Sequence, residues 1–363
     1  MNPIVVDAHQ DIAWNYVNNG RDFLQSAWRK RRREMVDPVF VSRYGRCMSG
    51  LPEAILGRIA VVCGTIFVSP AWTKMYPDEK ILYETPDEAY RLGIRQLEYY
   101  ERLAQETDRI RLITTQRDLD AVLATWADGN GLADHRLGIV LLMEGADPIL
   151  TPQHVEEWYA RGLRVIGPAW TQTRYSGGTK AVGPLTDLGR ELLDVMAGQG
   201  MVLDLSHMAP EAAREALDRY DGPIFAGHAN PLRFRPDRPD RNLSDDIIRG
   251  IAEHDGAVGI LPYNLFLIEG WRPGDRRDAA TMDHVIAAID HVCQVTGSAR
   301  HVGIGSDADG GFGSASVPVG FETVTDLLEI GPALAARGYA SDDIAAILGG
   351  NMLRVLRAGL PGE

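Results

Sequence analysis

Runs of apolar residues recur along this chain, and most of them are separated by stretches with a helical pattern. The runs are continuous rather than alternating, which is typical of strands that are buried on both faces of a parallel sheet. We count eight of them, at residues 5–11, 59–68, 137–143, 163–168, 201–206, 223–227, 257–262 and 302–306. Strands of this kind that alternate with helices predict an α/β protein.

Helix signals lie between the apolar runs. Thr85-Pro86-Asp87-Glu88 combines a cap, a proline at the first position and a glutamate three residues after the cap, which predicts a helix to about Gln105. Thr151-Pro152 opens another helix, and two more follow near residues 323–336 and 341–357. A further helix, which Gly200 ends, has an apolar face made of Leu185, Leu188, Leu192, Val195 and Met196.

Eight strand–helix units in 363 residues predict a closed (β/α)8 barrel, known as a TIM barrel. We expect one domain over residues 1–363, with a long insertion after the first strand that reaches about Arg58. The alternative is an open doubly wound sheet. That fold would place a glycine-rich loop after the first strand, where this chain has His9-Gln10-Asp11.

Composition narrows the classes of function. The net charge of −13 argues against nucleic acid or an anionic membrane as a partner. The chain has no apolar stretch long enough to span a membrane, and its start does not resemble a signal peptide. The three cysteines, Cys47, Cys63 and Cys293, form no CxxC motif and indicate reduced thiols. We therefore expect a cytoplasmic protein.

One basic run, Arg29-Lys30-Arg31-Arg32-Arg33, stands out in the insertion. It can be interpreted as a solvated helix face, which is the common role of such runs. The alternative is a positive patch that steers an anionic substrate.

Polar residues that bind metals follow five of the eight apolar runs. Barrel enzymes carry their chemistry at the carboxyl ends of the strands, so we expect these side chains to surround one opening. The residues are His9, Asp11, Glu144, His207, His228 and Asp307.

This set suits two zinc ions, since each ion needs about four ligands and an open position for water. His9, Asp11 and Glu144 would hold one ion, and Glu144, His207 and His228 the other, so that Glu144 bridges. Two ions about 3.5–4 Å apart can share a hydroxide and polarise a carbonyl group. Asp307 would then act as general base and general acid.

Several motifs together resemble the membrane (renal) dipeptidase family of zinc metallopeptidases, a branch of the amidohydrolase barrels. The resemblance covers nearly the whole chain, and the combination of motifs is more specific than any one of them. The motifs are Asp7-Ala8-His9-Gln10-Asp11, Met143-Glu144-Gly145, Leu203-Asp204-Leu205-Ser206-His207, Gly227-His228, Arg241-Asn242-Leu243-Ser244-Asp245, Gly305-Ser306-Asp307-Ala308-Asp309-Gly310 and Gly349-Gly350-Asn351-Met352-Leu353-Arg354-Val355.

The resemblance implies a binuclear zinc dipeptidase with the ligand roles given above. It also implies that Arg241 binds the C-terminal carboxylate of the substrate, and a guanidinium suits a carboxylate because it forms two parallel hydrogen bonds. The alternative for Arg241 is a surface ion pair. Asp309 lies close to Asp307 in sequence, and we prefer Asp307 because it comes first after the apolar run.

The chain departs from the family at Trp170, where the family usually places a histidine that contacts the substrate carbonyl. An indole offers one donor and carries no proton. Trp170 would bind the oxyanion or form a wall of the pocket, and Arg174 or Tyr175 could reach in instead. A carbamylated lysine is not expected as a bridge, because Lys180 lies in a loop.

The leading hypothesis is therefore a zinc dipeptidase that acts on small dipeptides, including those with a D-residue at the C-terminal side. A related metal-dependent hydrolase of another small amide or lactone is the second, motivated by Trp170. The third is a barrel that binds a ligand without catalysis. The oligomeric state stays open, with a homodimer as one candidate.

Overall fold

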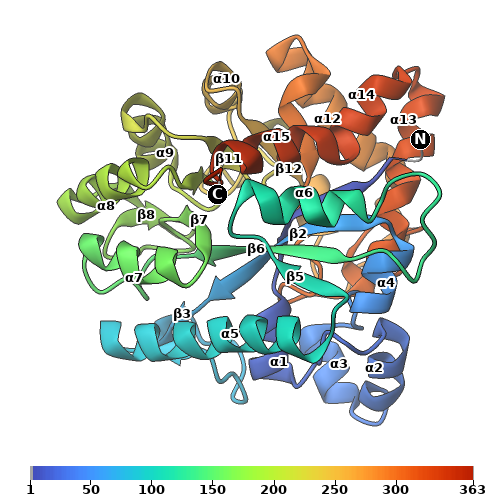
Figure 1. The fold of residues 1–363 in the computed structure, drawn as a ribbon, viewed down its shortest axis with the longest axis horizontal. Helices are drawn as coiled ribbons and strands as arrows, with labels where there is room; N and C mark the ends of the chain where they lie inside the picture. The colour runs from blue at the N-terminus through green and yellow to red at the C-terminus, as the bar shows by residue number, and fades with distance from the viewer. Residues whose placement is uncertain (1–2, 363) are drawn as a thin grey trace.

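A ring of parallel strands forms the centre of the molecule, which we describe from a computed structural model for residues 3–362 (Figure 1). Strands β1 and β13 pair through Asp7 and Ile304, and β2 pairs with β6 from Val61 to Phe67, which closes the ring. The predicted (β/α)8 barrel is confirmed. In ring order the strands are β1 (Val5–Gln10), β2 (Ile59–Phe67), β6 (Leu137–Glu144), β7 (Leu163–Gly167), β10 (Val202–Asp204), β11 (Ile224–Ala226), β12 (Ala257–Ile260) and β13 (Val302–Ile304).

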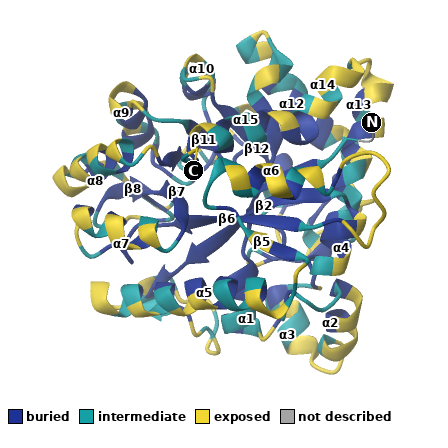
Figure 2. Cartoon of the chain, viewed as in Figure 1, coloured by how far each residue is buried: buried dark blue, intermediate teal, exposed yellow. Residues whose placement is uncertain are grey.

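The core lies in and around this ring. Every residue of β1, β2 and β6 is buried. Figure 2 shows the strands in the colour of buried residues, while the helices outside them carry exposed residues on their outer faces. This distribution explains why the strands are continuous apolar runs, since both of their faces are covered.

Helices surround the ring and connect its strands. The helix predicted from Thr85 is confirmed as α5 (Pro86–Glu106), and the Thr85 side chain accepts a hydrogen bond from the Glu88 amide. The others are α6 (Gln116–Ala124), α7 (Val155–Ala160), α8 (Asp187–Gly198), α9 (Pro210–Arg219), α10 (Asp245–Glu253), α11 (Asn264–Leu267), α12 (Met282–Thr296), α13 (Ile330–Arg337), α14 (Ser341–Ala345) and α15 (Asn351–Ala358).

The helix predicted from Leu185 begins later than expected. The Thr186 side chain accepts a hydrogen bond from the Gly189 amide and caps α8, so the helix starts at Asp187. Leu185 lies at the end of a strand instead, and Leu188 is 41% exposed. The prediction of both as members of the buried helix face was therefore wrong, whereas Leu192 and Met196 are buried in it.

Three short pairings were not predicted. Strand β5 (Ile110–Leu112) joins β6 at Leu137. Strands β3 (Ser69–Pro70) and β4 (Leu82–Tyr83) form a small sheet after β2, and β8 (Ser176–Gly178) and β9 (Ala181–Leu185) form a hairpin after β7. Because β2 and β7 end at the same side of the barrel, the two small sheets stand over its carboxyl-terminal end.

The insertion after β1 is helical, as its lack of strand signals indicated. Helix α1 packs against α5 (Figure 1). The insertion consists of α1 (Ile12–Asn19), α2 (Ala27–Glu34), α3 (Pro38–Tyr44) and α4 (Leu51–Leu56).

The basic run lies on α2 and is only partly solvated. Lys30 is buried and donates to the Ser49 carbonyl over 2.7 Å, and Arg31 is buried and donates to the Cys47 carbonyl over 2.6 Å. The other three arginines are exposed. The interpretation as a solvated face was therefore wrong for Lys30 and Arg31, which hold α2 against the segment before α4.

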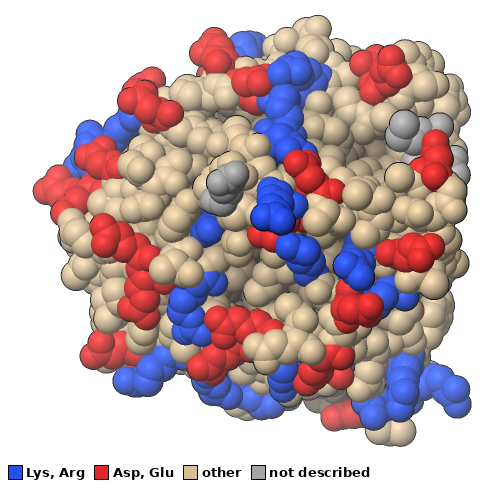
Figure 3. Space-filling model, viewed as in Figure 1, with Lys and Arg blue, Asp and Glu red and all other residues tan. Residues whose placement is uncertain are grey.

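Charge of both signs is spread over the surface. On the face seen in Figure 3, acidic and basic side chains alternate, and neither sign forms a continuous field. Within residues 3–362, none of the helices combines the length and the apolar character that a membrane crossing requires.

Asp309 fastens the insertion to the barrel. Its buried carboxylate accepts hydrogen bonds from the Met48 amide (2.7 Å), the Ser49 amide (3.0 Å) and the Ser49 hydroxyl (2.9 Å). The Arg21 guanidinium lies 3.6 Å from it. A residue next to the last barrel strand thus holds two parts of the insertion, so Asp309 has a structural role.

This role predicts a loss of stability. Asp309→Ala leaves the buried donors of Met48 and Ser49 without an acceptor and removes one of the two acids beside Arg21, and we expect the free energy of unfolding to fall by about 3 kcal/mol. Urea titration followed by circular dichroism measures this change. Asp128→Ala, at an exposed loop position, is the control and should change stability by less than about 0.5 kcal/mol. Equal stability of the two variants would contradict the role of Asp309.

Candidate metal centre and substrate pocket

The predicted polar residues come together at the carboxyl ends of the strands. Glu144 is the last residue of β6, and its carboxylate lies between histidines from three other strand ends. Its Oε2 is 3.6 Å from Nε2 of His9, and its Oε1 is 3.3 Å from Nε2 of both His207 and His228. Glu144 is therefore placed where one carboxylate can serve two ions.

Two further carboxylates lie on the His9 side of this cluster. Oδ1 of Asp11 and Oδ1 of Asp307 are each 3.9 Å from Nε2 of His9. The cluster therefore contains two sets of three ligand residues, and both sets include His9. Within each set, the ligand atoms lie within 4.8 Å of one another. The sets are His9, Glu144 and His228, and His9, Asp11 and Asp307.

The hydrogen bonding of the cluster fits a bound cation. Neither ring nitrogen of the buried His9 has a hydrogen-bond partner among the described residues, and Nδ1 of His228 also lacks one there. Nε2 of His207 and Nε2 of His228 approach to 3.1 Å and turn toward the same space as Glu144. Buried polar atoms without partners are costly, and imidazole with carboxylate is a donor set that zinc binds.

Burial keeps the imidazoles neutral. It lowers the pKa of His9 to about 3 and the pKa values of His207 and His228 well below their ordinary value, and the Arg241 charge acts in the same direction. A neutral imidazole has the free lone pair that a metal ligand needs.

Burial has the opposite effect on the acids. It raises the pKa of Asp11 to about 6 and the pKa values of Glu144 and Asp307 well above their ordinary range. The charge of Asp11 adds to the effect on Glu144 and Asp307, and the charge of Asp309 adds to the effect on Asp11. Without a cation the cluster therefore binds protons, which a divalent ion would displace.

A second set of residues positions the cluster from below. Asp7 accepts hydrogen bonds from the Ser306 amide (2.7 Å) and the Gln10 side chain (2.7 Å), which links β1 to the segment that carries Asp307. The Thr65 hydroxyl donates to Asp11. Sequence reasoning assigned no role to Asp7, although an acid inside an apolar run is a signal that a partner must lie nearby.

Asp204 positions the segments that carry His207 and His228. It accepts hydrogen bonds from the amides of Ser206 (2.8 Å) and Gly227 (2.9 Å), and the Ser206 hydroxyl accepts one from the His228 amide (3.0 Å). The Thr179 hydroxyl lies 3.0 Å from Nδ1 of His207. Asp204 also stands inside an apolar run and was also missed.

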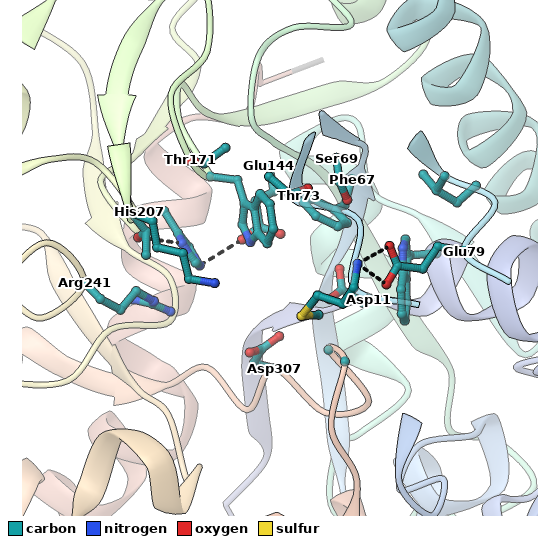
Figure 4. A pocket seen from close by; sticks show the side chains of 18 of the residues that line it. Asp11, Phe67, Ser69, Thr73, Glu79, Glu144, Thr171, His207, Arg241 and Asp307 are labelled. Atoms are coloured by element: carbon teal, nitrogen blue, oxygen red, sulfur yellow. Dashed lines mark hydrogen bonds and ion pairs between the residues drawn. The ribbon is translucent and has the colours of Figure 1, made fainter. Parts of the chain in front are cut away.

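Strained backbone directs two of the side chains. His207 has φ 66° and Asp307 has φ 52°, the left-handed region that residues other than glycine rarely adopt. Such strain is held only where the surroundings fix it, and both residues lie directly after a barrel strand. The turns point both side chains into the space above the ring (Figure 4).

A cavity of about 420 Å³ opens above the cluster. Figure 4 shows His207 and Arg241 on one side of it, Glu79 on the opposite side, and Glu144, Asp11 and Asp307 between them. Aromatic and apolar side chains from the insertion, the end of β2 and the β3–β4 segment form much of the wall. They include Trp14, Tyr44, Phe67, Trp72, Met75, Tyr76 and Ile81.

Arg241 lies in the cavity wall and not in a surface ion pair. It is buried, and its Nη2 donates to the His228 carbonyl over 2.8 Å. Its guanidinium stands 5.0 Å from the centre of the Phe266 ring, and its Nε has no hydrogen-bond partner among the described residues. A buried cation in the wall of a cavity is suited to an anionic ligand.

Trp170 forms part of the wall beside Phe67, with the ring centres 4.9 Å apart. Arg174 and Tyr175 do not take its place. Arg174 binds Asp147 and nearby carbonyl groups, and the Tyr175 hydroxyl donates to the Ile149 carbonyl, so neither reaches the cavity. The alternative that either residue reaches in was wrong.

Comparison with known proteins agrees with this geometry. A family model described as membrane dipeptidase, peptidase family M19, matches residues 2–359. The chain belongs to this family. The resemblance inferred from the motifs is thereby confirmed, and the members are metallopeptidases.

Individual relatives cover the chain to different extents. An uncharacterized dipeptidase of Schizosaccharomyces pombe is 37% identical over 171 residues, which is 47% of this chain and 39% of the relative. An uncharacterized protein of Klebsiella pneumoniae, from the pqqA 5′ region, is 30% identical over 266 residues, 70% of this chain and 91% of its own length. The chain thus spans well under half of the yeast relative.

A solved structure shows the same fold. The metallopeptidase of Rhodobacter sphaeroides, liganded with a phosphinate mimic of the dipeptide L-Ala-D-Ala, has a TM-score of 0.78 at 23% identity and covers 99% of this chain and 100% of its own. At this sequence identity, the structural similarity supports the (β/α)8 barrel fold of the chain.

The raised pKa values of the acids predict how stability depends on pH after treatment with a chelator. An acid whose pKa is higher in the folded state than in the unfolded state ionises less readily when the protein is folded. It therefore destabilises the folded state once the unfolded chain loses the proton. This destabilisation is absent at low pH and grows as pH rises above about 4. We expect Glu144→Gln to be more stable than the wild type in EDTA, with a gain that increases between pH 5 and pH 8 by at most about 1.4 kcal/mol per unit.

Thermal and urea unfolding across this pH range measure the gain. Glu98→Gln, at an exposed position on α5, is the matched control and should show no such trend. A gain from Glu144→Gln that is constant with pH would contradict the interpretation.

Proposed function

We propose that this protein is a dipeptidase with two zinc ions, and that it hydrolyses the peptide bond of small dipeptides. The observation that carries the proposal is the position of Glu144 between His9 on one side and His207 and His228 on the other, at the base of a cavity that also contains Arg241. Membership of the membrane dipeptidase family supports it.

We assign the residues to two ligand groups that share Glu144, which differ from the two sets of neighbouring ligand atoms that share His9. His9 and Asp11 would hold one ion with it, and His207 and His228 the other. When bound, the ions supply a polarised carbonyl group and an activated water molecule. The three neutral imidazoles, together with Asp11 and Glu144, provide the donors that this requires.

Asp307 is our candidate for the proton carrier. Its carboxylate lies beside His9 at the cavity surface, 3.9 Å from Nε2, and is 13% exposed. Burial raises its pKa well above the ordinary range, which makes its carboxylate a stronger base than a solvated one. It would take a proton from the attacking water and deliver it to the nitrogen of the leaving amine.

Arg241 and Trp170 would orient the substrate. The Arg241 guanidinium lines the cavity and would donate to the C-terminal carboxylate of a dipeptide. The Trp170 ring bounds the space next to His207, at 6.3 Å between ring centres, and its single N–H is the one donor that it can offer to the scissile carbonyl group. The phosphinate complex of the Rhodobacter sphaeroides protein motivates tests with a D-residue at the C-terminal side.

Trp170 also favours a second candidate. A related hydrolase of another small amide or a lactone would keep the metals and Asp307 but would not need the histidine that the family usually has at this position. A barrel that binds a ligand without catalysis is a third candidate, which the complete ligand set disfavours. A cytoplasmic location and a homodimer stay predictions.

A dipeptide panel with zinc-loaded protein tests the function. We expect release of amino acids from dipeptides with an L-residue or a D-residue at the C-terminal side, close to two zinc ions per chain by elemental analysis, and loss of zinc from Glu144→Ala. Absence of turnover on every dipeptide, with zinc bound, would favour the second or third candidate.

The role of Asp307 is tested by Asp307→Asn. We expect kcat to fall by about 10³-fold, within the range for loss of a general acid and base, while the zinc content and the unfolding midpoint stay near those of the wild type. Asp309→Asn provides the contrast, because it should lower stability. Unchanged kcat in Asp307→Asn would show that another group carries the proton.

A further inference from the structure

Three cationic side chains line one side of the cavity: Lys180, Arg238 and Arg241. Among residues 3–362, no carboxylate oxygen lies within 4.0 Å of their charged nitrogen atoms. The three charges are therefore available to a ligand.

The fold brings these side chains together from two separate segments. Lys180 lies at the turn between β8 and β9, whereas the two arginines lie in the loop between β11 and α10. Asp240 joins the segments, because its carboxylate accepts a hydrogen bond from the Lys180 amide over 2.8 Å and its carbonyl lies 3.3 Å from the Thr179 hydroxyl. Asp240 thus fixes the backbone of Lys180 while the ammonium group stays without an ion pair.

A shared aromatic ring positions the two arginines. The guanidinium of Arg241 lies 5.0 Å from the centre of the Phe266 ring, and that of Arg238 lies 6.0 Å from the same centre. The acid nearest in sequence to Arg238, Asp237, is bound by both Nε and Nη2 of Arg235 at 2.8 Å. Arg238 is half-buried at the cavity, so its charge is directed to the ligand side.

The opposite wall has a different character. It is formed by the aromatic and apolar residues named above, and its acid is Glu79, whose carboxylate accepts hydrogen bonds from the Met75 and Tyr76 amides (Figure 4). The cavity thus has one cationic and one largely apolar side, and the cluster of metal ligands lies between them.

We propose that the cationic side selects substrates whose C-terminal residue carries a second negative charge, that is, dipeptides that end in aspartate or glutamate. This inference rests on the proposed function, in which Arg241 binds the α-carboxylate. One carboxylate needs one guanidinium, so Lys180 and Arg238 are left for a further anion on the same residue. A dipeptide whose acidic side chain is on its N-terminal residue would place that charge toward the apolar side of the cavity. Lys180 and Arg238 would then not increase its affinity.

Isosteric dipeptide pairs test the proposal. For the zinc-loaded wild type we expect kcat/KM for Ala-Glu to exceed that for Ala-Gln by about tenfold at low salt, with the same order for Ala-Asp over Ala-Asn, tested with both stereoisomers at the C-terminal position. The ratio should shrink as salt is added. Glu-Ala should show no advantage over Gln-Ala.

Charge-removing variants locate the effect. Arg238→Met should lower the Ala-Glu to Ala-Gln ratio of kcat/KM about fivefold, and Lys180→Met, at a more exposed position, about threefold. Lys74→Met is the matched control, since Lys74 is exposed in the segment between β3 and β4 and does not line the cavity. A wild-type ratio of one or less, or ratios that the two variants leave unchanged, would overturn the proposal.

Binding separates this inference from the proposed function. Calorimetry with the zinc-loaded wild type measures the Kd values of isosteric dipeptide pairs, such as Ala-Glu and Ala-Gln, that are hydrolysed slowly or not at all. If no dipeptide is hydrolysed, the proposed function fails, yet tighter binding of Ala-Glu than Ala-Gln that Arg238→Met abolishes still supports the cationic site. Equal binding of both dipeptides overturns the inference whatever the turnover.

Discussion

The burial of three carboxylates among three imidazoles at one end of the barrel is the constraint on which the rest of the structure depends. Glu144 is held in place by strands on both sides, because its residue pairs with Phe67 of β2 and with Gly167 of β7. Its carboxylate therefore cannot withdraw to solvent. The repulsion between the acids is tolerated only where the surroundings fix them and a cation is available to compensate them.

The supporting network shows how the fold meets this requirement. Asp7 and Asp204 are buried acids of the strands themselves, and each uses its carboxylate to bind backbone amides that follow a neighbouring strand. These hydrogen bonds hold the turns that carry Asp307 and His228. The positions of the candidate ligands are thus set by the hydrogen bonds beneath them as much as by the strands.

The insertion after β1 has two roles that its sequence does not reveal. Asp309 fastens it to the barrel by accepting a hydrogen bond from the Met48 amide, while Lys30 and Arg31 hold its helix α2 by donating to backbone carbonyl groups within the insertion. Through Trp14 and Tyr44 it also supplies part of the apolar wall of the cavity. This wall is apolar and the side opposite it is cationic, so the cavity is asymmetric. It matches a substrate that is apolar at one end and anionic at the other.

The sequence by itself determined the barrel, the strand ends that carry the six candidate site residues and the family. These depend on local patterns: continuous apolar runs, caps such as Thr85, and polar residues placed directly after a strand. The start of α8 was missed because a single hydrogen bond from the Gly189 amide to Thr186 outweighs the periodicity that includes Leu185. The sequence favoured Asp307 over Asp309, but only the tertiary structure gave Asp309 its role in holding the insertion. Only the tertiary structure also buried Lys30 and Arg31 and placed Lys180, Arg238 and Arg241 in the wall of one cavity. Those outcomes depend on which distant backbone groups and charges meet in space, and residues far apart in sequence carry no local signal of that meeting.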